Sequence, residues 1–246
     1  GTKFEMETVT IGGIPTRVWK HAPPSLAWLI SASRMHGERV FTIYEDERVS
    51  YAANFRAVAT LAHALVAMGI GKGDRVGLAM RNLPEWPVIF FAAASIGAIV
   101  VPLNAWWTAG ELEYGIADSG CRVLFVDDER YQRLVAHAPD VPALETMIVA
   151  RASGPLGDGA RRLEDLIGTP HGYASLPDAE LPGVAIATDD DATIFYTSGT
   201  TGHPKGALGT HRNLMPNILS TAFGGARAFV RRGEAVPDPQ PRTYLT

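Results

Sequence analysis

The chain has very little cysteine and no surplus of positive charge. Cys121 is the single cysteine among 246 residues, which excludes an internal disulfide and a zinc site built from several thiolates. Lysine and arginine total 22 against 26 aspartates and glutamates, and this net charge of -4 gives no basic surface for general nucleic-acid binding. A lone cysteine is typical of a reducing compartment, so we expect a cytoplasmic protein.

Long apolar runs are scarce as well. The first residues, GTKFEMETVTIGG, lack the basic patch and apolar stretch of a secretory signal. Residues 86–110 carry no charge, but Gly97 interrupts the run and Pro102 ends it, short of the roughly 20 apolar residues of a membrane-spanning helix. We therefore interpret this segment as a buried helix over residues 85–96 and a buried strand at residues 99–101.

The apolar pattern elsewhere alternates between helices and strands. A helix is predicted after Ser50, a good N-cap, with a stop at Gly69. Between them apolar residues recur at steps of three and four, namely Tyr51, Phe55, Val58, Ala62 and Leu65. Further strands are predicted at residues 74–79, 123–126 and 146–149, and further helices at residues 110–118 and 128–137. This alternation predicts an α/β fold with mostly parallel sheets flanked by helices.

Residues 151–183 are rich in glycine, proline and small polar residues, and we interpret them as a surface connection with one short helix near residues 161–167. They end a first α/β subdomain, residues 1–183, and the start of a second subdomain follows at residues 184–246. There we expect a strand at residues 193–196, a helix from Thr210 to about Ser220 and an irregular exposed segment over residues 224–242. The β-prone ending YLT predicts a chain that is truncated within a strand.

The chemically informative segment follows the strand predicted at residues 193–196. Ten consecutive residues, TSGTTGHPKG from Thr197 to Gly206, contain three glycines, four hydroxyls and Lys205. Glycines let backbone N–H groups turn inward, hydroxyls add donors and the lysine adds positive charge. Such a loop suits a polyphosphate, because each hydrogen bond to an ionised group contributes about 1.5–3 kcal/mol. For the ten residues taken alone, a hairpin turn with an exposed lysine is the alternative.

Two common phosphate-binding loops do not match this sequence. A P-loop NTPase requires Gly-Lys followed by Ser or Thr, whereas Pro204 precedes Lys205 and Gly206 follows it. The glycines at positions 69, 71 and 73 lead from a predicted helix into a predicted strand. A dinucleotide loop has the reverse order, so we interpret these glycines as a helix stop and a turn.

The string YTSGTTGHPKG, followed by THRNL, resembles the phosphate-binding signature of the adenylate-forming (AMP-binding) superfamily. This superfamily includes acyl-CoA synthetases, firefly luciferase and the adenylation domains of peptide synthetases. The resemblance covers virtually the whole chain, through Val49-Ser50-Tyr51 and the segments GIGKGDRVGLAMRNLPEW, IGAIVVPLN and ELEYGIADSGCRVLFVD. Asn104 in the PLN segment, where peptide synthetases more often carry Asp, favours the fatty-acid branch of the acyl-CoA synthetases.

The resemblance implies a two-step ligase. ATP and a carboxylic acid, a fatty acid in this branch, would form an acyl-adenylate and pyrophosphate, and coenzyme A would then displace AMP to give a thioester. Donors and Mg²⁺ that bind the charge growing on pyrophosphate would lower the barrier to attack on the α-phosphorus. The residues that the resemblance assigns to the β- and γ-phosphates are Thr197, Ser198, Gly199, Thr200, Thr201, Gly202 and Lys205.

Members of the superfamily are about twice as long as this chain. They continue with an acidic motif for adenine and metal, a ribose-binding Asp, a hinge and a small C-terminal domain with a catalytic lysine. Without those contacts, we expect the 246 residues alone to form no acyl-adenylate. Two alternatives stay open: a non-catalytic nucleotide-binding module, which predicts a stop codon near Thr246, and an adenylating enzyme that loads a carrier protein.

Several other polar and aromatic residues are interpreted as structural. We expect His211, which follows a helix cap, to pack or hydrogen-bond without a catalytic role. The acidic runs at residues 127–129 and 189–191 are expected at a helix N-terminus and a strand entrance, because consecutive acids cannot all face one metal ion. We expect Trp106 and Trp107 to pack against neighbouring elements, and Cys121 to be unreactive beside a strand.

Overall fold

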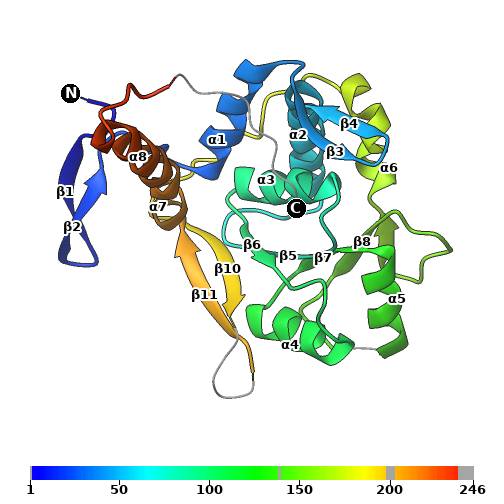
Figure 1. Ribbon diagram of the computed structural model, residues 1–246. Coiled ribbons are helices and arrows are strands. Elements are labelled where there is room, and N and C mark those ends of the chain that lie inside the picture. The colour runs from blue at the N-terminus through cyan, green and yellow to red at the C-terminus, as the bar shows by residue number, and fades with distance from the viewer. Residues whose placement is uncertain (1, 138–139, 198–202, 238–246) are drawn as a thin grey trace.

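The computed structural model describes residues 2–137, 140–197 and 203–237, and a seven-stranded sheet forms the centre of this part of the chain (Figure 1). The strand order is β11-β10-β6-β5-β7-β8-β9. Every neighbouring pair is parallel except β10 and β11, which are antiparallel. The predicted α/β fold with a mostly parallel sheet is confirmed.

The order in which the chain adds strands to the sheet reverses at β5. The strand that follows β5 in sequence lies on one side of it, and the next strand lies on the other side. Because these strands and β10 are parallel, their carboxyl ends share one edge, called the carboxyl edge here. The strands are β5 (Arg75–Ala79), β6 (Ile99–Pro102), β7 (Val123–Asp127), β8 (Thr146–Ala150), β9 (Ala160–Arg162), β10 (Asp191–Thr197) and β11 (Lys205–Thr210).

Helices cover both faces of the sheet. In β7, Val123 and Phe125 belong to the core that includes α2 (Tyr51–Ala67) and α3 (Glu85–Ser95). The alternate residues Leu124 and Val126 pack on the other face, against α4 (Ala109–Ser119) and α5 (Asp128–His137). Because side chains of a strand alternate between faces, a strand covered on both sides must be apolar throughout. This explains the unbroken apolar run VLFV in β7.

The remaining elements lie around this sheet. Two separate hairpins are formed by β1 with β2 and by β3 with β4, and α8 contacts β2. Their bounds are β1 (Met6–Ile11), β2 (Ile14–Trp19), β3 (Val40–Tyr44) and β4 (Glu47–Ser50). The shorter helical elements and the last helix are α1 (Leu26–Ser33), η1 (Arg34–His36), α6 (Glu164–Ile167), η2 (Pro170–Ser175), α7 (His211–Leu214) and α8 (Pro216–Arg231).

Several local predictions are confirmed. The Ser50 side chain accepts the N–H of Ala53 at the start of α2, and Gly69 takes a left-handed φ of 79° after its end. The uncharged segment at residues 86–110 contains the buried helix α3, apart from its first residue Glu85, and the buried strand β6, as predicted. Within the described ranges, we find no helix with the length and apolar character needed to cross a membrane.

Two segments differ from their prediction. Residues 151–183 are more than a surface connection, because β9 joins the sheet there and the side chains of Leu163, Ile167 and Tyr173 are buried in the core. These elements are too short to give a periodic signal. Residues 224–231 are helical, not irregular, because they continue α8. Leu219 is buried, and the half-buried residues that follow it at steps of three and four form one inward face of the helix. These residues are Ala222, Ala226 and Phe229.

Other expectations are left open by the structure. The two strands β10 and β11 belong to the same sheet as β5 to β9, and the division of the chain between residues 183 and 184 stays a prediction. The ending YLT lies outside the described residues. The hairpins, α1 and β11 had no counterpart among the sequence predictions, because elements of four to eight residues give little periodic signal.

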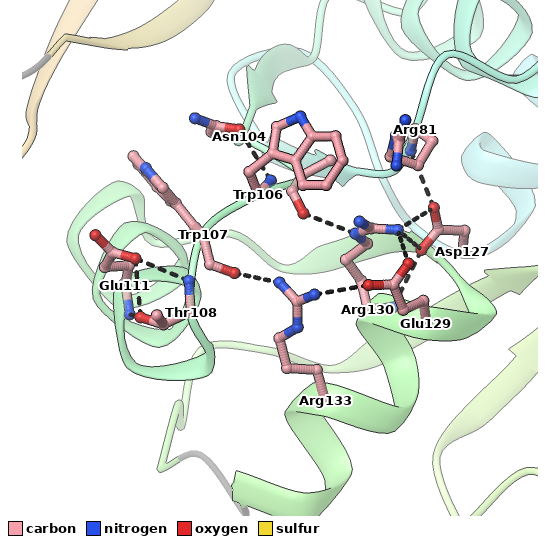
Figure 2. A network of polar contacts seen from close by, with 11 residues as sticks. Arg81, Asn104, Trp106, Trp107, Thr108, Glu111, Asp127, Glu129, Arg130 and Arg133 are labelled. Atoms are coloured by element: carbon pink, nitrogen blue, oxygen red, sulfur yellow. Dashed lines mark hydrogen bonds and ion pairs between the residues drawn. The ribbon is translucent and has the colours of Figure 1, made fainter.

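A buried ion pair joins three strand ends at the carboxyl edge (Figure 2). The side chains of Asp127 and Arg130 are 9% and 1% exposed, and Arg130 Nη1 lies 3.0 Å from Asp127 Oδ2. Asp127 Oδ2 also accepts the N–H of Arg81, after β5, at 2.9 Å. Arg130 Nε donates to the carbonyl of Ala105, after β6, at 2.8 Å. The pair therefore fixes the connections that leave β5 and β6 against the end of β7.

A second arginine of α5 holds the start of α4. Arg133 donates to the carbonyl of Trp107 and pairs with Glu129, with 2.8 Å between Nη2 and Oε1 (Figure 2). Thr108 and Glu111 then form a capping box, in which each side chain accepts the other's backbone N–H. The segment from β6 to α4 is thus fixed by α5 at one end and by its own helix cap at the other.

Cys121 lies in a tight contact between β5 and α4. Its side chain is buried, and a Cβ on Gly77 would come within 3.1 Å of Cys121 Sγ and 2.7 Å of Leu124 Cδ1. Glycine is therefore required at position 77 for these elements to approach. Burial raises the pKa of the Cys121 thiol to about 11, although the hydroxyl of Ser119 lies 3.1 Å away and lowers it.

The ion pair at the carboxyl edge should be strongly stabilising. We expect Asp127→Ala to lower the free energy of unfolding of the complete protein by about 3–5 kcal/mol, because the buried Arg130 loses its buried partner and keeps only the exposed carboxylate of Glu129. Urea unfolding followed by circular dichroism measures the change. Asp165→Ala, at an exposed aspartate of α6, is the matched control and should cost less than about 0.5 kcal/mol. Equal losses in the two variants would contradict the assigned role of Asp127.

Cys121 should resist thiol reagents while the protein is folded. A pKa raised from 9.0 to about 11 leaves about a hundredfold less thiolate at pH 8, and burial also blocks access. We expect reaction with a disulfide reagent at pH 8 to be slower in native than in urea-unfolded protein by a factor of about 100 or more. Rapid labelling of the native protein at Cys121, identified by mass spectrometry, would exclude the buried thiol.

Candidate phosphate-binding site

The predicted phosphate loop begins at the end of β10 and ends at the start of β11 (Figure 1). Thr197 pairs with Lys205 across the two strands, and both residues are exposed. Thr197 Oγ1 lies 3.5 Å from the carbonyl oxygen of Lys205. The other residues predicted to hold phosphate, Ser198, Gly199, Thr200, Thr201 and Gly202, lie outside the described residues. The binding role of all seven stays a prediction.

The position of the hairpin follows from its strands. Thr193 in β10 pairs with Val100 in β6 in the parallel sense, so Thr197 leaves the sheet at the carboxyl edge. A Cβ at Gly206 would come within 2.9 Å of Ile194 Cγ2, so the second strand needs glycine to lie this close to the first. Ligands of open α/β sheets bind beyond the carboxyl ends of the parallel strands, and the loop begins at that edge.

The residue before the loop is held by α4. Tyr196 donates its hydroxyl proton to Asp118, with 2.6 Å between Oη and Oδ2. Trp107 lies edge-on to the Tyr196 ring, with 5.7 Å between ring centroids. A Cβ on Gly115 would come within 2.9 Å of Trp107 Cζ3, so the indole fits only beside glycine. Burial, with the Asp118 carboxylate as the next cause, raises the pKa of Tyr196 well above its usual range.

The end of the loop also contacts α4. The His203 ring stacks on Tyr114, with 5.0 Å between centroids and 28° between ring planes. Tyr114 lies four residues before Asp118, so both residues fall on one face of the helix. One helix therefore contacts Tyr196, just before the predicted phosphate loop, and His203 within it.

His211 has the structural environment that the sequence predicts. Its side chain is buried, and Nδ1 accepts the backbone N–H of Leu26 at 3.2 Å. Burial lowers its pKa, which favours the neutral ring. Thr210 and Asn213 form a capping box at the start of α7, with Asn213 Oδ1 2.8 Å from the Thr210 nitrogen. The interpretation of His211 as a packing and hydrogen-bonding residue is confirmed.

The acidic runs also lie where the sequence places them. Helix α5 begins at Asp128, and β10 begins at Asp191. Asp189 pairs with Arg212, and Asp190 pairs with Lys72, with 2.6 Å between Oδ2 and Nζ. Among the residues that the structure describes, no group of three or more His, Cys, Asp or Glu side chains is arranged to hold a metal ion.

The neighbouring tryptophans have different surroundings. Trp107 packs against Tyr196, as the sequence predicts. Trp106 is 70% exposed and does not enter the core. The Arg81 guanidinium carbon lies 4.1 Å from the centroid of the Trp106 ring, the geometry of a cation–π contact (Figure 2). This pair forms part of the surface at the carboxyl edge.

Sequence reasoning missed a charged cluster at the end of β8. Arg151 has a φ of 57° and directs its guanidinium to Glu85 and Glu47, with N–O distances of 2.8 and 2.6 Å. Burial raises the pKa of Glu85, although its pairing with Arg151 lowers it. The cluster joins α3 and β4 to the sheet. No local signal reveals it, because the partners lie 66 and 104 residues from Arg151.

The sequence matches known proteins along most of its length. Residues 30–237 match the family described as AMP-binding enzyme. Long-chain-fatty-acid–CoA ligase FadD13 of Mycobacterium tuberculosis is 33% identical over 203 residues, which are 80% of this chain and 37% of that protein. Feruloyl-CoA synthase of an Amycolatopsis species is 34% identical over 194 residues, which are 79% of this chain and 35% of that protein. The chain thus spans little more than a third of these relatives.

Solved structures agree with the sequence relatives. The N-terminal domain of FACL13 from Mycobacterium tuberculosis has a TM-score of 0.62 and 31% identity, over 76% of this chain and 44% of that one. The anthranilate CoA ligase AuaEII shares the fold, with a TM-score of 0.69 and 24% identity over 82% of this chain and 37% of that one. The family match includes β10, β11 and the loop between them. This chain is therefore a member of the AMP-binding enzyme family.

Proposed function

We propose that the chain is the amino-terminal part of an ATP-dependent acyl-CoA synthetase. A carboxylate oxygen of the acid attacks the α-phosphorus of ATP, and pyrophosphate leaves with the electrons of the broken P–O bond. The thiolate of coenzyme A then attacks the acyl carbon, AMP leaves and a thioester remains. Relatives named as CoA ligases and CoA synthases support this reaction class.

The hairpin of β10 and β11 is the main structural observation that supports the proposal. It brings Thr197 and Lys205 opposite each other at the carboxyl edge, where both side chains are open to solvent. A lysine and a hydroxyl at this position would bind the negative charge that grows on pyrophosphate as it leaves. The residues proposed to contact the β- and γ-phosphates are Thr197, Ser198, Gly199, Thr200, Thr201, Gly202 and Lys205.

We propose a fatty acid as the carboxylic substrate. FadD13 is named for long-chain fatty acids, whereas feruloyl-CoA synthase is named for an aromatic acid, so both classes occur among relatives of similar identity. Asn104 supports the fatty-acid branch by resemblance alone. Its Oδ1 accepts the N–H of Trp106 at 2.9 Å, a contact that an aspartate would also make.

Mg²⁺ is proposed to bind together with ATP. Mg²⁺ in nucleotide sites is bound by substrate phosphates and water together with one or two carboxylates. The resemblance places the acidic metal-binding motif beyond this chain, so the contribution proposed for this chain is electrostatic. Lys205 and the loop donors would hold the phosphates in position, and this arrangement favours in-line departure of pyrophosphate.

Removal of the loop lysine should impair the first half-reaction. In the complete protein, we expect Lys205→Ala to lower carboxylate-dependent ATP–pyrophosphate exchange by about a hundredfold, the usual cost of losing one charged donor to a leaving group. Lys205→Arg should retain more activity than Lys205→Ala because it keeps the charge. Lys3→Ala, at an exposed lysine, is the control and should behave like the wild type. Full exchange by Lys205→Ala would contradict the proposed role.

The same assay decides between the proposed enzyme and a non-catalytic module. The wild-type protein is offered short, long and aromatic acids, and then coenzyme A or a phosphopantetheinylated carrier protein as the thiol. We expect exchange with fatty acids and thioester formation with coenzyme A. ATP binding that depends on Lys205, without pyrophosphate release from any acid, would instead support the nucleotide-binding module. Thioester formation on the carrier protein alone would support the carrier-loading enzyme.

The 246 residues alone should not form an acyl-adenylate. Phosphate contacts from one loop cannot replace the base, ribose and acyl contacts that orient both substrates, and orientation supplies much of the rate of such reactions. We expect a verified 26.4 kDa sample to show no carboxylate-dependent ATP–pyrophosphate exchange above background. Exchange by that sample, abolished in its Lys205→Ala variant, would show that the chain holds a complete adenylation site.

A further inference from the structure

Two side chains of α4 contact the predicted phosphate loop or the residue just before it. Asp118 accepts the hydroxyl proton of Tyr196, which directly precedes the loop, at 2.6 Å. Tyr114 stacks on His203, which comes near its end, at a centroid distance of 5.0 Å. The two contacts start one helical turn apart, at positions i and i+4. Neither pair belongs to the residues assigned to phosphate.

Helix α4 is rigidly placed relative to the sheet. Leu112 and Ile116 are fully buried in the core on that face, and the capping box at Thr108 fixes the first turn. Gly120 ends the helix with a left-handed φ of 65°. The Trp107 carbonyl, just before the helix, is held by Arg133 of α5. Side chains on the exposed face of α4 therefore provide fixed points outside the loop.

We propose that Tyr114 and Asp118 are positioning residues for the phosphate loop. The inference rests on the proposed function of that loop as the phosphate-binding site. Tyr196 directly precedes Thr197, and His203 lies two residues before Lys205, so the two contacts restrict the described residues that are proposed to bind phosphate. Contacts that hold Tyr196 and His203 on one helix exist before ligand arrives. Less conformational entropy is then lost when Thr197 and Lys205 bind ATP.

The two contacts differ in chemistry, so they can be tested separately. The Tyr114–His203 stack depends on the ring of residue 114 and not on its hydroxyl. The Tyr196–Asp118 contact depends on a hydroxyl proton and a carboxylate. Tyr114→Phe therefore preserves the first contact, whereas Tyr196→Phe removes the second.

The first experiment measures loop restraint without reference to activity. Amide hydrogen exchange is followed in the complete protein for the peptide that contains Lys205 and Gly206. We expect Tyr114→Ala to accelerate exchange about two- to tenfold, the range that corresponds to loss of one aromatic pair, and Tyr114→Phe to match the wild type. Glu113→Ala is the matched control, because Glu113 neighbours Tyr114 on α4 but contacts His137. Unchanged exchange in Tyr114→Ala would overturn the proposal.

The second experiment measures the consequence for ATP. In ATP–pyrophosphate exchange, we expect Tyr114→Ala to raise KM for ATP about two- to tenfold with KM for the carboxylate unchanged, and Tyr114→Phe to restore the wild-type value. Asp118→Ala and Tyr196→Phe remove the same hydrogen bond, so the double variant should be no worse than the more impaired single variant. Equal increases in both KM values, or additive losses in the double variant, would contradict a positioning role.

The two experiments separate failure of this inference from failure of the proposed function. If the wild-type protein exchanges no pyrophosphate with any acid, the acyl-CoA synthetase proposal fails, and hydrogen exchange still decides whether α4 restrains the loop. If the wild type is active but Tyr114→Ala leaves both hydrogen exchange and KM for ATP unchanged, the positioning proposal fails and the proposed function stands.

Discussion

The arrangement of the carboxyl edge depends on one desolvated ion pair, between Asp127 and Arg130. Asp127 fixes the chain that leaves β5, and Arg130 fixes the chain that leaves β6. Two charges out of water need both partners and further hydrogen bonds to be tolerated, and the two connections supply those hydrogen bonds. Arg130 holds the carbonyl of Ala105, so the pair also restrains the segment that leads to α4. Trp107, in the same segment, lies against Tyr196, the residue before the predicted phosphate loop.

Glycine at two positions makes this support possible. Gly77 lets β5 approach Leu124 and Cys121, and Gly115 lets the indole of Trp107 lie against α4. Neither glycine has a positive φ, so the requirement is for space and not for an unusual backbone conformation. A core packed this closely transmits the position of one element to the next, because side chains at native density cannot move independently.

The sequence was most informative where local pattern and burial coincide. The span of α2, the apolar run of β7 and the start of α5 at Asp128 all follow from caps and periodicity. The loop itself was recognised from its glycines, hydroxyls and Lys205. Contacts between distant positions, such as Tyr114 with His203, could not be predicted from the sequence. No local pattern links a helix residue to a loop residue 89 positions later. Helix α8 was missed past Gly224 because two adjacent glycines have low helix propensity, which packing overrides.

Arg151 illustrates a position where backbone and side chain favour different amino acids. Its left-handed φ of 57° suits glycine and costs an arginine about 1 kcal/mol or more. Its guanidinium, however, neutralises Glu85 and Glu47, which no glycine could do. Substitution by glycine would relax the main chain and leave two carboxylates facing each other, whereas lysine would keep the charge but lose the forked geometry. Few amino acids satisfy both demands, so position 151 should tolerate less sequence variation than its half-exposed location suggests.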